Sequence, residues 1–133
     1  MRVTGLDHVN LRVADADRSL GFYGDVLGLV PDRLDAFRRG DTPLLTMRVS
    51  EEAVIHLRPT EGFSPPPPEE LSAAFDHVAV QVEGRMDDVV AELERRGIPL
   101  DGEPFDAYGA LGLGRAVYIR DPDGYRVELK TRS

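Results

Sequence analysis

The sequence has no cysteine and no long apolar run, and each absence excludes a class of protein. Without cysteine neither disulfides nor thiolate metal sites can form, so any metal must bind through imidazole, carboxylate or water. No apolar run approaches the length of a membrane span, and the N-terminus lacks the basic, apolar and small-residue succession of a signal peptide. We therefore expect a cytoplasmic protein with no membrane partner.

Positive charge is also in short supply. Lys and Arg number 16 against 24 Asp and Glu, which gives a net charge of −8. Such a field repels the phosphate backbone, so we expect no nucleic-acid partner. At 133 residues, with 41% hydrophobic and 30% charged residues, the chain fits one ordinary globular domain.

An internal repeat dominates the sequence. Residues 6–13 (LDHVNLRV) align with residues 75–82 (FDHVAVQV), and the same shift without a gap places Gly28 on Gly97. Residues 54–57 (VIHL) match residues 126–129 (RVEL) after a three-residue insertion in the second copy. A repeat of this kind decides the architecture, so we divide the chain into module 1 (about 1–62), a proline-rich linker (about 63–73) and module 2 (about 74–133).

Each module is expected to have the order βαβββ. Alternation and helical spacing predict, in the first copy, a strand at 7–13, a helix from Asp15 to about Leu27, and strands near 34–38, 44–49 and 53–58. In the second copy they predict a strand at 76–82, a helix around 86–93, and strands near 105–108, 115–120 and 125–130. The predicted fold class is α+β, with the two tandem modules forming a cupped eight-stranded mixed sheet and helices on its outer face.

Four side chains of metal-ligand type fall on the sheet face opposite the predicted helices. In each strand the apolar neighbours point to the helix side, which turns these four residues to the other face: His8, His56, His77 and Glu128. A single strand histidine is usually only solvated or hydrogen-bonded. Here both copies place an imidazole at the same position of their first strands and a ligand-type residue at the same position of their last strands, so we expect the four to converge on one divalent cation.

The chain resembles the vicinal oxygen chelate superfamily, which includes glyoxalase I, extradiol catechol dioxygenases, fosfomycin-resistance transferases and bleomycin-resistance binding proteins. The resemblance covers essentially the whole chain, and it lies in four segments: 5–9 (GLDHV), 19–29 (SLGFYGDVLGL), 75–80 (FDHVAV) and 118–129 (YIRDPDGYRVEL). It is specific for the superfamily and leaves the reaction open.

The resemblance implies a set of roles. His8, His77 and Glu128 occupy the positions of the family's metal ligands, and His56 lies where glyoxalase-like members have a fourth ligand, usually Glu or Gln. His56 is therefore either a ligand or a base beside the metal, which would be Fe, Mn, Ni, Co or Zn. The catalytic candidates are His56, Tyr118 and Glu128.

Several reactions fit this pattern. Tyr118 precedes Glu128 by the ten residues seen in extradiol dioxygenases. The chain has no fourth histidine for the non-ligand role near dioxygen, which weakens this assignment unless His56 takes that role. Fosfomycin transferases need a basic residue well beyond the ligand Glu, whereas the sequence ends at Ser133. Lyase- or isomerase-type proton transfer needs a base, and His56 could serve. A metal-free small-molecule binding protein of the bleomycin-resistance type is the alternative from another class.

The partner expected in every case is a small molecule, bound by a chain that forms a homodimer. Further polar side chains predicted on the ligand face are weaker substrate-binding candidates: Asn10, Arg12, Arg58, Gln81 and Arg120. The glycine-rich segment 108–114 does not lead from a strand into a helix as a phosphate loop does, so it is predicted to be a mobile hairpin loop over the site.

Overall fold

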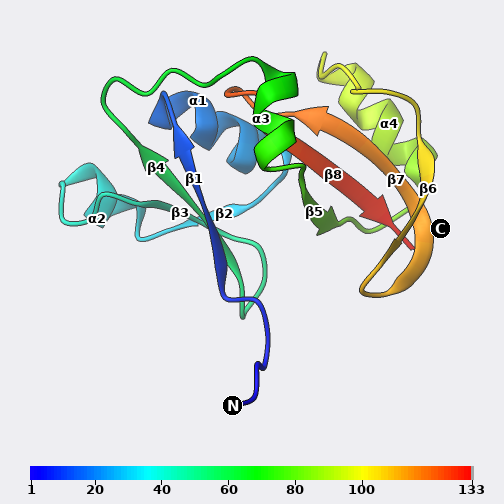
Figure 1. Ribbon diagram of the computed structural model, residues 1–133, viewed down its shortest axis with the longest axis horizontal. Helices are drawn as coiled ribbons and strands as arrows, with labels where there is room; N and C mark the ends of the chain where they lie inside the picture. The colour runs from blue at the N-terminus through cyan, green and yellow to red at the C-terminus, as the bar shows by residue number, and fades with distance from the viewer. Residues whose placement is uncertain (133) are drawn as a thin grey trace. The chain divides into compact units, whose positions relative to one another are not determined.

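The computed structural model describes residues 1–132, and its contacts divide the chain into two compact units between Pro65 and Pro66. The first unit contains β1 (His8–Val13), α1 (Ala16–Leu20), a π-helical turn η1 (Gly21–Val26), β2 (Val30–Asp32), α2 (Leu34–Arg38), β3 (Leu45–Arg48) and β4 (Val54–Pro59). Its four strands form one sheet in the order β1-β4-β3-β2, where β1 and β4 are parallel and the other pairs antiparallel (Figure 1).

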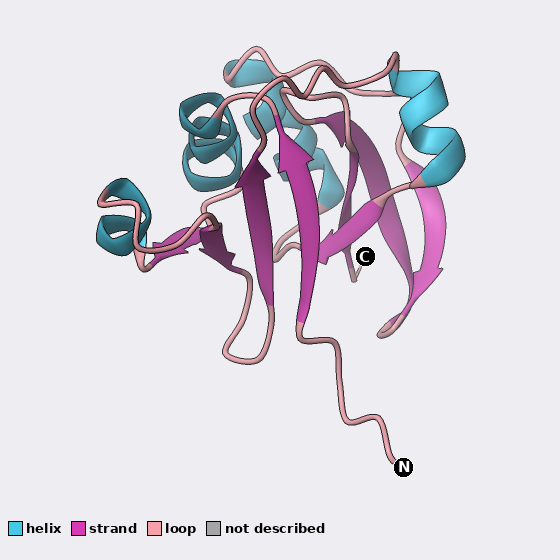
Figure 2. Cartoon of the chain, turned by 60° about the vertical axis from the view of Figure 1, so that its left-hand side comes forward, coloured by secondary structure: helices cyan, strands magenta, loops and turns pink. Residues whose placement is uncertain are grey.

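The second unit repeats this plan. It contains α3 (Pro68–Ala74), β5 (Val78–Gln81), α4 (Met86–Arg95), β6 (Phe105–Gly109), β7 (Gly112–Arg120) and β8 (Arg126–Thr131). The sheet order is β5-β8-β7-β6, again with one parallel pair between the first and last strands. The α+β class and the duplicated module are therefore confirmed, and the eight strands form two four-stranded sheets, one in each unit (Figure 2).

The first predicted helix is confirmed, and its beginning and end follow the expected chemistry. The Asp15 carboxylate accepts a hydrogen bond from the Arg18 backbone N–H at 2.9 Å and caps α1. The helix then widens into η1 and stops at Gly28, whose φ of +72° belongs to the left-handed region. Because α1 packs on β4, this short helix covers one face of the first sheet.

The strand predicted near 34–38 is wrong. Residues Leu34–Arg38 form the helix α2, and the sheet strand lies earlier, at Val30–Asp32. Leu34 and Phe37 are three residues apart, which suits one turn of helix, whereas Leu34 and Ala36 are two apart, which suits a strand. The segment therefore fits both periods. Arg33, at φ 56°, makes the break between strand and helix.

The predicted linker contains an element that the sequence pattern did not indicate. The prolines are followed by α3, which begins at Pro68, a position where the missing N–H costs nothing, and carries Glu69 and Glu70 in its first turn. None of the helices in residues 1–132 is both long enough and apolar enough to span a membrane.

Strand parity is confirmed in the first module and modified in the second. In β1, Leu11 and Val13 are buried, while Asn10 and Arg12, which alternate with them, are exposed. In β8, Val127 and Leu129 are buried as predicted, but the opposite face is also buried, because Glu128 is only 6% exposed. The Glu128 carboxylate is therefore buried, although it lies on the face opposite the apolar side chains of β8.

Candidate functional site

The first module brings two of the predicted ligands together. His8 opens β1 and His56 lies on the parallel neighbour β4, whose register pairs His56 with Asn10, two residues along from His8. Two residues is the strand period, so both imidazoles project from the same face. Their ring centroids are 4.8 Å apart with an edge-to-face tilt.

Both rings are oriented through Nδ1. His8 Nδ1 contacts the Asp7 carboxylate at 2.5 Å, and His56 Nδ1 lies 2.9 Å from the hydroxyl of Thr46, its register partner on β3. A partner on one ring nitrogen fixes the ring plane and the tautomer. In both residues the nitrogen left for a ligand or a proton is Nε2.

The first module also lowers the basicity of His56. Burial lowers the pKa of His56 below its ordinary value, the positive charge of His8 lowers it further, and the carboxylate of Asp7 opposes both effects. The neutral form of His56 is therefore favoured at neutral pH, and a neutral imidazole is the form that binds a metal or accepts a proton.

The second module brings His77 and Glu128 together. His77 immediately precedes β5, and β5 runs parallel to β8, where Glu128 is opposite Ala79. His77 Nε2 lies 3.0 Å from Glu128 Oε2, and His77 Nδ1 contacts the Asp76 carboxylate at 2.5 Å. The repeat thus reproduces the aspartate–histidine contact of the first module.

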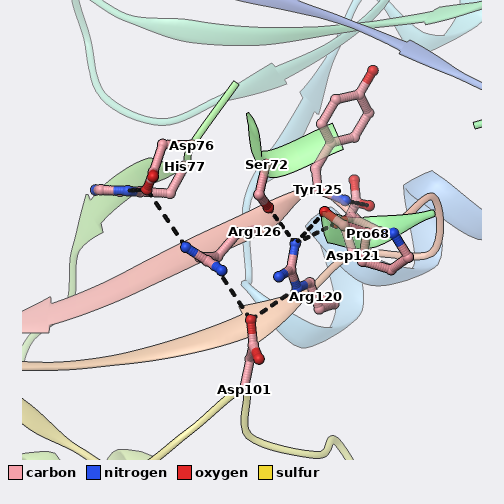
Figure 3. Close-up of polar contacts among 10 residues, drawn as sticks. Pro68, Ser72, Asp76, His77, Asp101, Arg120, Asp121, Tyr125 and Arg126 are labelled. Carbon is pink, nitrogen blue, oxygen red and sulfur yellow. Dashed lines mark hydrogen bonds and ion pairs between the residues drawn. The ribbon is translucent and has the colours of Figure 1, made fainter. Parts of the chain in front are cut away.

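A chain of alternating charges supports this second aspartate (Figure 3). Arg126 Nη1 is 3.6 Å from Asp76 Oδ1, and Arg126 Nε is 3.3 Å from Asp101 Oδ2. Arg120 Nε lies 2.8 Å from the same oxygen, Asp101 Oδ2. The hydrogen bond and charge of His77, followed by the charge of Arg126, hold the pKa of Asp76 below its ordinary value, so the contact with His77 keeps its carboxylate character.

Tyr118 lies on the predicted face, directly opposite Glu128 on β7. Its ring is packed between aromatic and cationic groups, with the His77 and Phe105 rings at 5.3 and 4.8 Å and the Arg126 guanidinium 4.9 Å above its centre. Burial and then the negative charge of Glu128 raise the pKa of the Tyr118 hydroxyl. At neutral pH it is therefore protonated and can donate a hydrogen bond.

These two pairs have the chemistry of metal ligands. Two ligands that lie about 2.1 Å from one cation at a right angle are about 3 Å apart, which matches the separation of His77 Nε2 and Glu128 Oε2. Metal-binding histidines also tend to give their other nitrogen to a carboxylate, as His8 and His77 do here. Within residues 1–132 no three His, Cys, Asp or Glu side chains gather as a complete metal site, so each module offers a pair.

The weaker substrate candidates differ in how strongly the fold engages them. Asn10, Arg58 and Gln81 are exposed strand residues, and the Arg12 guanidinium donates to the Thr60 hydroxyl at 3.3 Å. Arg120 instead contacts Asp101, and its Nη1 donates to the Ser72 hydroxyl and to the Gly124 carbonyl at 2.7 and 2.9 Å. It ties α3 to the turn between β7 and β8, which is a structural task.

Sequence reasoning missed the residues that hold the ligands in place. Asp7 and Asp76 were visible as the repeated Asp-His dipeptide, so the repeat carried a signal for them. No sequence pattern pointed to Thr46 or Arg126, because their roles depend on which strands become neighbours.

Comparison with known proteins places the chain in a family. The model of the Glyoxalase/Bleomycin resistance protein/Dioxygenase superfamily matches residues 5–129. The chain belongs to this superfamily, as the resemblance of its motifs predicts.

Individual relatives carry different names. A probable lactoylglutathione lyase of Synechocystis is 32% identical over 130 residues, covering 92% of this chain and 91% of that protein. An integron cassette protein from V. cholerae has a TM-score of 0.76 at 25% identity, covering 100% of this chain and 98% of the other. An antibiotic-binding protein from Streptomyces shares the fold, with a TM-score of 0.69 at 19% identity over 100% and 99% of the two chains.

Proposed function

We propose that this protein is a metal-dependent lyase of the lactoylglutathione-lyase type, acting on a small molecule with two adjacent oxygen functions. The observation that carries the proposal is the pair of ligand sets, His8 with His56 and His77 with Glu128, each oriented by its own module. The relatives named lactoylglutathione lyase favour proton transfer over oxygen activation. The absence of a fourth histidine points the same way.

His8, His77 and Glu128 would hold one divalent cation (Fe, Mn, Ni, Co or Zn), with His56 as a fourth ligand or as a base beside it. Once bound, such a cation supplies a Lewis acid that polarises the two substrate oxygens. His8 and His77 are held for this task by the carboxylates on their Nδ1 atoms. The donor set of neutral imidazole and carboxylate suits all five metals.

The chain's own residues provide the proton transfer. His56 is neutral near pH 7 because burial lowers its pKa, so it can accept a proton from one substrate carbon and return it to the next. Tyr118 is protonated and lies opposite Glu128, where it can donate a hydrogen bond to a substrate oxygen. The exposed Asn10, Arg12, Arg58 and Gln81 are the proposed contacts for the rest of the substrate.

The test measures metal content and turnover together. Purified protein should contain one of the five metals in mass spectrometry, and His8→Ala and Glu128→Ala should each lose it. The metal-loaded protein should convert the hemithioacetal of methylglyoxal and glutathione to lactoylglutathione, and His56→Gln should slow this by about 100-fold or more. Glu51→Ala, which removes an exposed turn carboxylate, is the matched control and should behave as the wild type.

Two outcomes would overturn the proposal. Unchanged metal content in both ligand variants would remove the metal site. A protein without metal or turnover that is nonetheless stabilised thermally by an antibiotic would be a binding protein of the bleomycin-resistance class. The proposal also has the chain working as a cytoplasmic homodimer, and sedimentation at the mass of one chain would contradict the dimer.

A further inference from the structure

The two modules share an aspartate–arginine pair beside the turn that joins their last two strands. In module 1, Asp32 at the end of β2 lies 2.7 Å from Arg48 on β3, and the Arg48 guanidinium donates to the Ser50 carbonyl in that turn. The repeat places Asp101 and Arg120 at the equivalent positions of module 2. They are 2.8 Å apart, and Arg120 likewise donates to a carbonyl of the turn. Because both copies have this pair, it belongs to the fold of each module.

Module 2 adds a second arginine to the pair. Arg126, the first residue of β8, is the register partner of Arg120, whereas the register partner of Arg48 in module 1 is Val54. Two positive side chains directly opposite each other on neighbouring strands repel. Asp101 Oδ2 offsets that repulsion, because it lies 2.8 Å from Arg120 Nε and 3.3 Å from Arg126 Nε. Module 2 therefore accommodates a guanidinium where module 1 has an apolar side chain.

Arg126 reaches two functional side chains from this position (Figure 3). Its Nη1 is 3.6 Å from Asp76 Oδ1, the oxygen that contacts His77 Nδ1 at 2.5 Å. Its Cζ lies over the Tyr118 ring, 4.9 Å from the centroid. Asp101, which anchors the guanidinium, is itself held on β7, because its backbone N–H donates to the Tyr118 carbonyl at 2.8 Å. One guanidinium thus contacts the partner of a metal ligand and the ring of a hydroxyl donor.

The backbone gives His77 less support than it gives its counterpart in module 1. The ladder between β5 and β8 begins at Val78, so His77 lies just outside it. His8 is the first residue of the ladder between β1 and β4. The position of the His77 ring therefore depends more strongly on its side-chain contacts, and the module that needs this support is the one that has the additional arginine.

We propose that the planar guanidinium of Arg126 is a positioning group that fixes His77, through Asp76, and Tyr118, by stacking, as one unit. The inference rests on the proposed function for the roles of these two side chains. A guanidinium presents donors along its edges to both aspartates while its flat face covers a ring. An ammonium is a compact point charge with no flat face, so lysine cannot make the same set of contacts.

The first test uses metal-free protein labelled with ¹³C in the histidine and tyrosine rings. Arg126→Val introduces the residue that module 1 has at this place, and it should lower the NMR order parameters of the His77 and Tyr118 rings together. Arg115→Val is the matched control. It removes another arginine–aspartate pair of the same sheet, 2.8 Å between Arg115 Nη1 and Asp106 Oδ1, and should leave both rings as ordered as in the wild type.

Three results of this measurement would overturn the proposal. They are wild-type order of both rings in Arg126→Val, loss of order in only one of the two rings, and an equal loss in Arg115→Val. If Arg126→Val does not fold, Asp101→Asn takes its place, because it removes the anchor and leaves the guanidinium. Asp101→Asn should also lower the order of both rings, and wild-type order there would then overturn the proposal.

Lysine separates position from charge. Arg126→Lys keeps a positive charge near the two aspartates and loses the planar fork. Both rings should remain as mobile as in Arg126→Val. Full recovery of their order in Arg126→Lys would mean that charge alone holds them, and would overturn the role of the guanidinium.

Metal binding gives the size of the effect. In competition calorimetry with Zn²⁺, Arg126→Val and Arg126→Lys should each bind about tenfold more weakly or worse, as expected when the partner behind a metal-binding histidine is disturbed. Arg115→Val should bind as the wild type does. Wild-type affinity in Arg126→Val would count against the proposal.

The outcomes separate this inference from the proposed function, because the ring measurements need no metal. If the wild type binds none of the five metals while the order of both rings still depends on Arg126, the metal enzyme is refuted and the positioning role is retained. If the wild type binds metal and Arg126→Val binds it equally well with both rings ordered, the positioning role is refuted and the metal site is retained.

Discussion

At the scale of single residues, the fold acts most directly on the charge of His56. Partial burial and the neighbouring His8 both disfavour its protonated form. In metal-free protein we expect the NMR titration of the His56 ring to lie below its ordinary value of 6.5. His8→Gln removes the repelling charge and should raise the His56 pKa.

The same shift has a consequence for stability. Because the folded pKa lies below the unfolded one, the unfolded chain binds more protons in the window between them. The contribution of His56 is therefore fully present above pH 6.5 and is lost as the pH falls toward the folded pKa. The free energy of unfolding in urea, measured between these two pKa values, should therefore depend less steeply on pH in His56→Gln than in the wild type. An unchanged slope, or a His56 titration at or above 6.5, would contradict the account.

At the scale of elements, the closest approach in the second sheet is at Gly114 of β7. A Cβ there would lie 2.0 Å from the Thr131 carbonyl oxygen on β8, a distance that backbone atoms cannot relieve by a rotamer change. Gly114→Ala should lower the free energy of unfolding by roughly 2 kcal/mol or more. Gly21, at φ −60° in the first helix, has nothing within 4 Å of a new Cβ. Gly21→Ala should be stabilising by about 0.5–1 kcal/mol.

Denaturant unfolding of the two alanine variants, followed by circular dichroism, tests this contrast. Equal free energies of unfolding for Gly114→Ala and Gly21→Ala would mean that Gly114 of β7 is further from the Thr131 carbonyl of β8 than in the structure. The long strand β7 supports Tyr118, so the same distortion should also reach the proposed site.

Elements also differ in how readily the sequence reveals them. The helices that begin at Ala16 and Met86 have clear helical spacing and end at glycines with positive φ, and both were predicted. The short helix Leu34–Arg38 was read as a strand, because five residues fit either period. Helix α3 was hidden behind a proline run that reads as an extended linker.

At the scale of the whole molecule, the proposed metal needs ligands from both modules. An ion that binds only the folded state stabilises each module that contributes a ligand to it. At a free ion concentration of about 100 Kd the gain is about 2.7 kcal/mol. We therefore expect metal to slow hydrogen exchange by the same factor at the core amides of both sheets, such as those of Leu57 and Leu129. In His77→Ala the metal effect should vanish from both sheets together.

Protection confined to one sheet would mean that a single module holds the ion. Binding of two ions per chain would mean that the pairs act separately. The first module alone supplies two imidazoles, and the second supplies an imidazole and a carboxylate. Each pair contains ligands that bind divalent metals, so either result is consistent with the chemistry of the pairs.

The sequence alone determined the duplication, the α+β class, and the parity that puts His8 and His56 on one face, because these depend on local periodicity and on comparison of the chain with itself. Tertiary structure decided what periodicity cannot encode. Pairing of β3 with β4 puts Thr46 on His56, pairing of β7 with β8 puts Tyr118 opposite Glu128, and strand packing encloses Lys130. Each depends on which distant segments become neighbours, and that choice is made by burial of the shared core rather than by any local pattern.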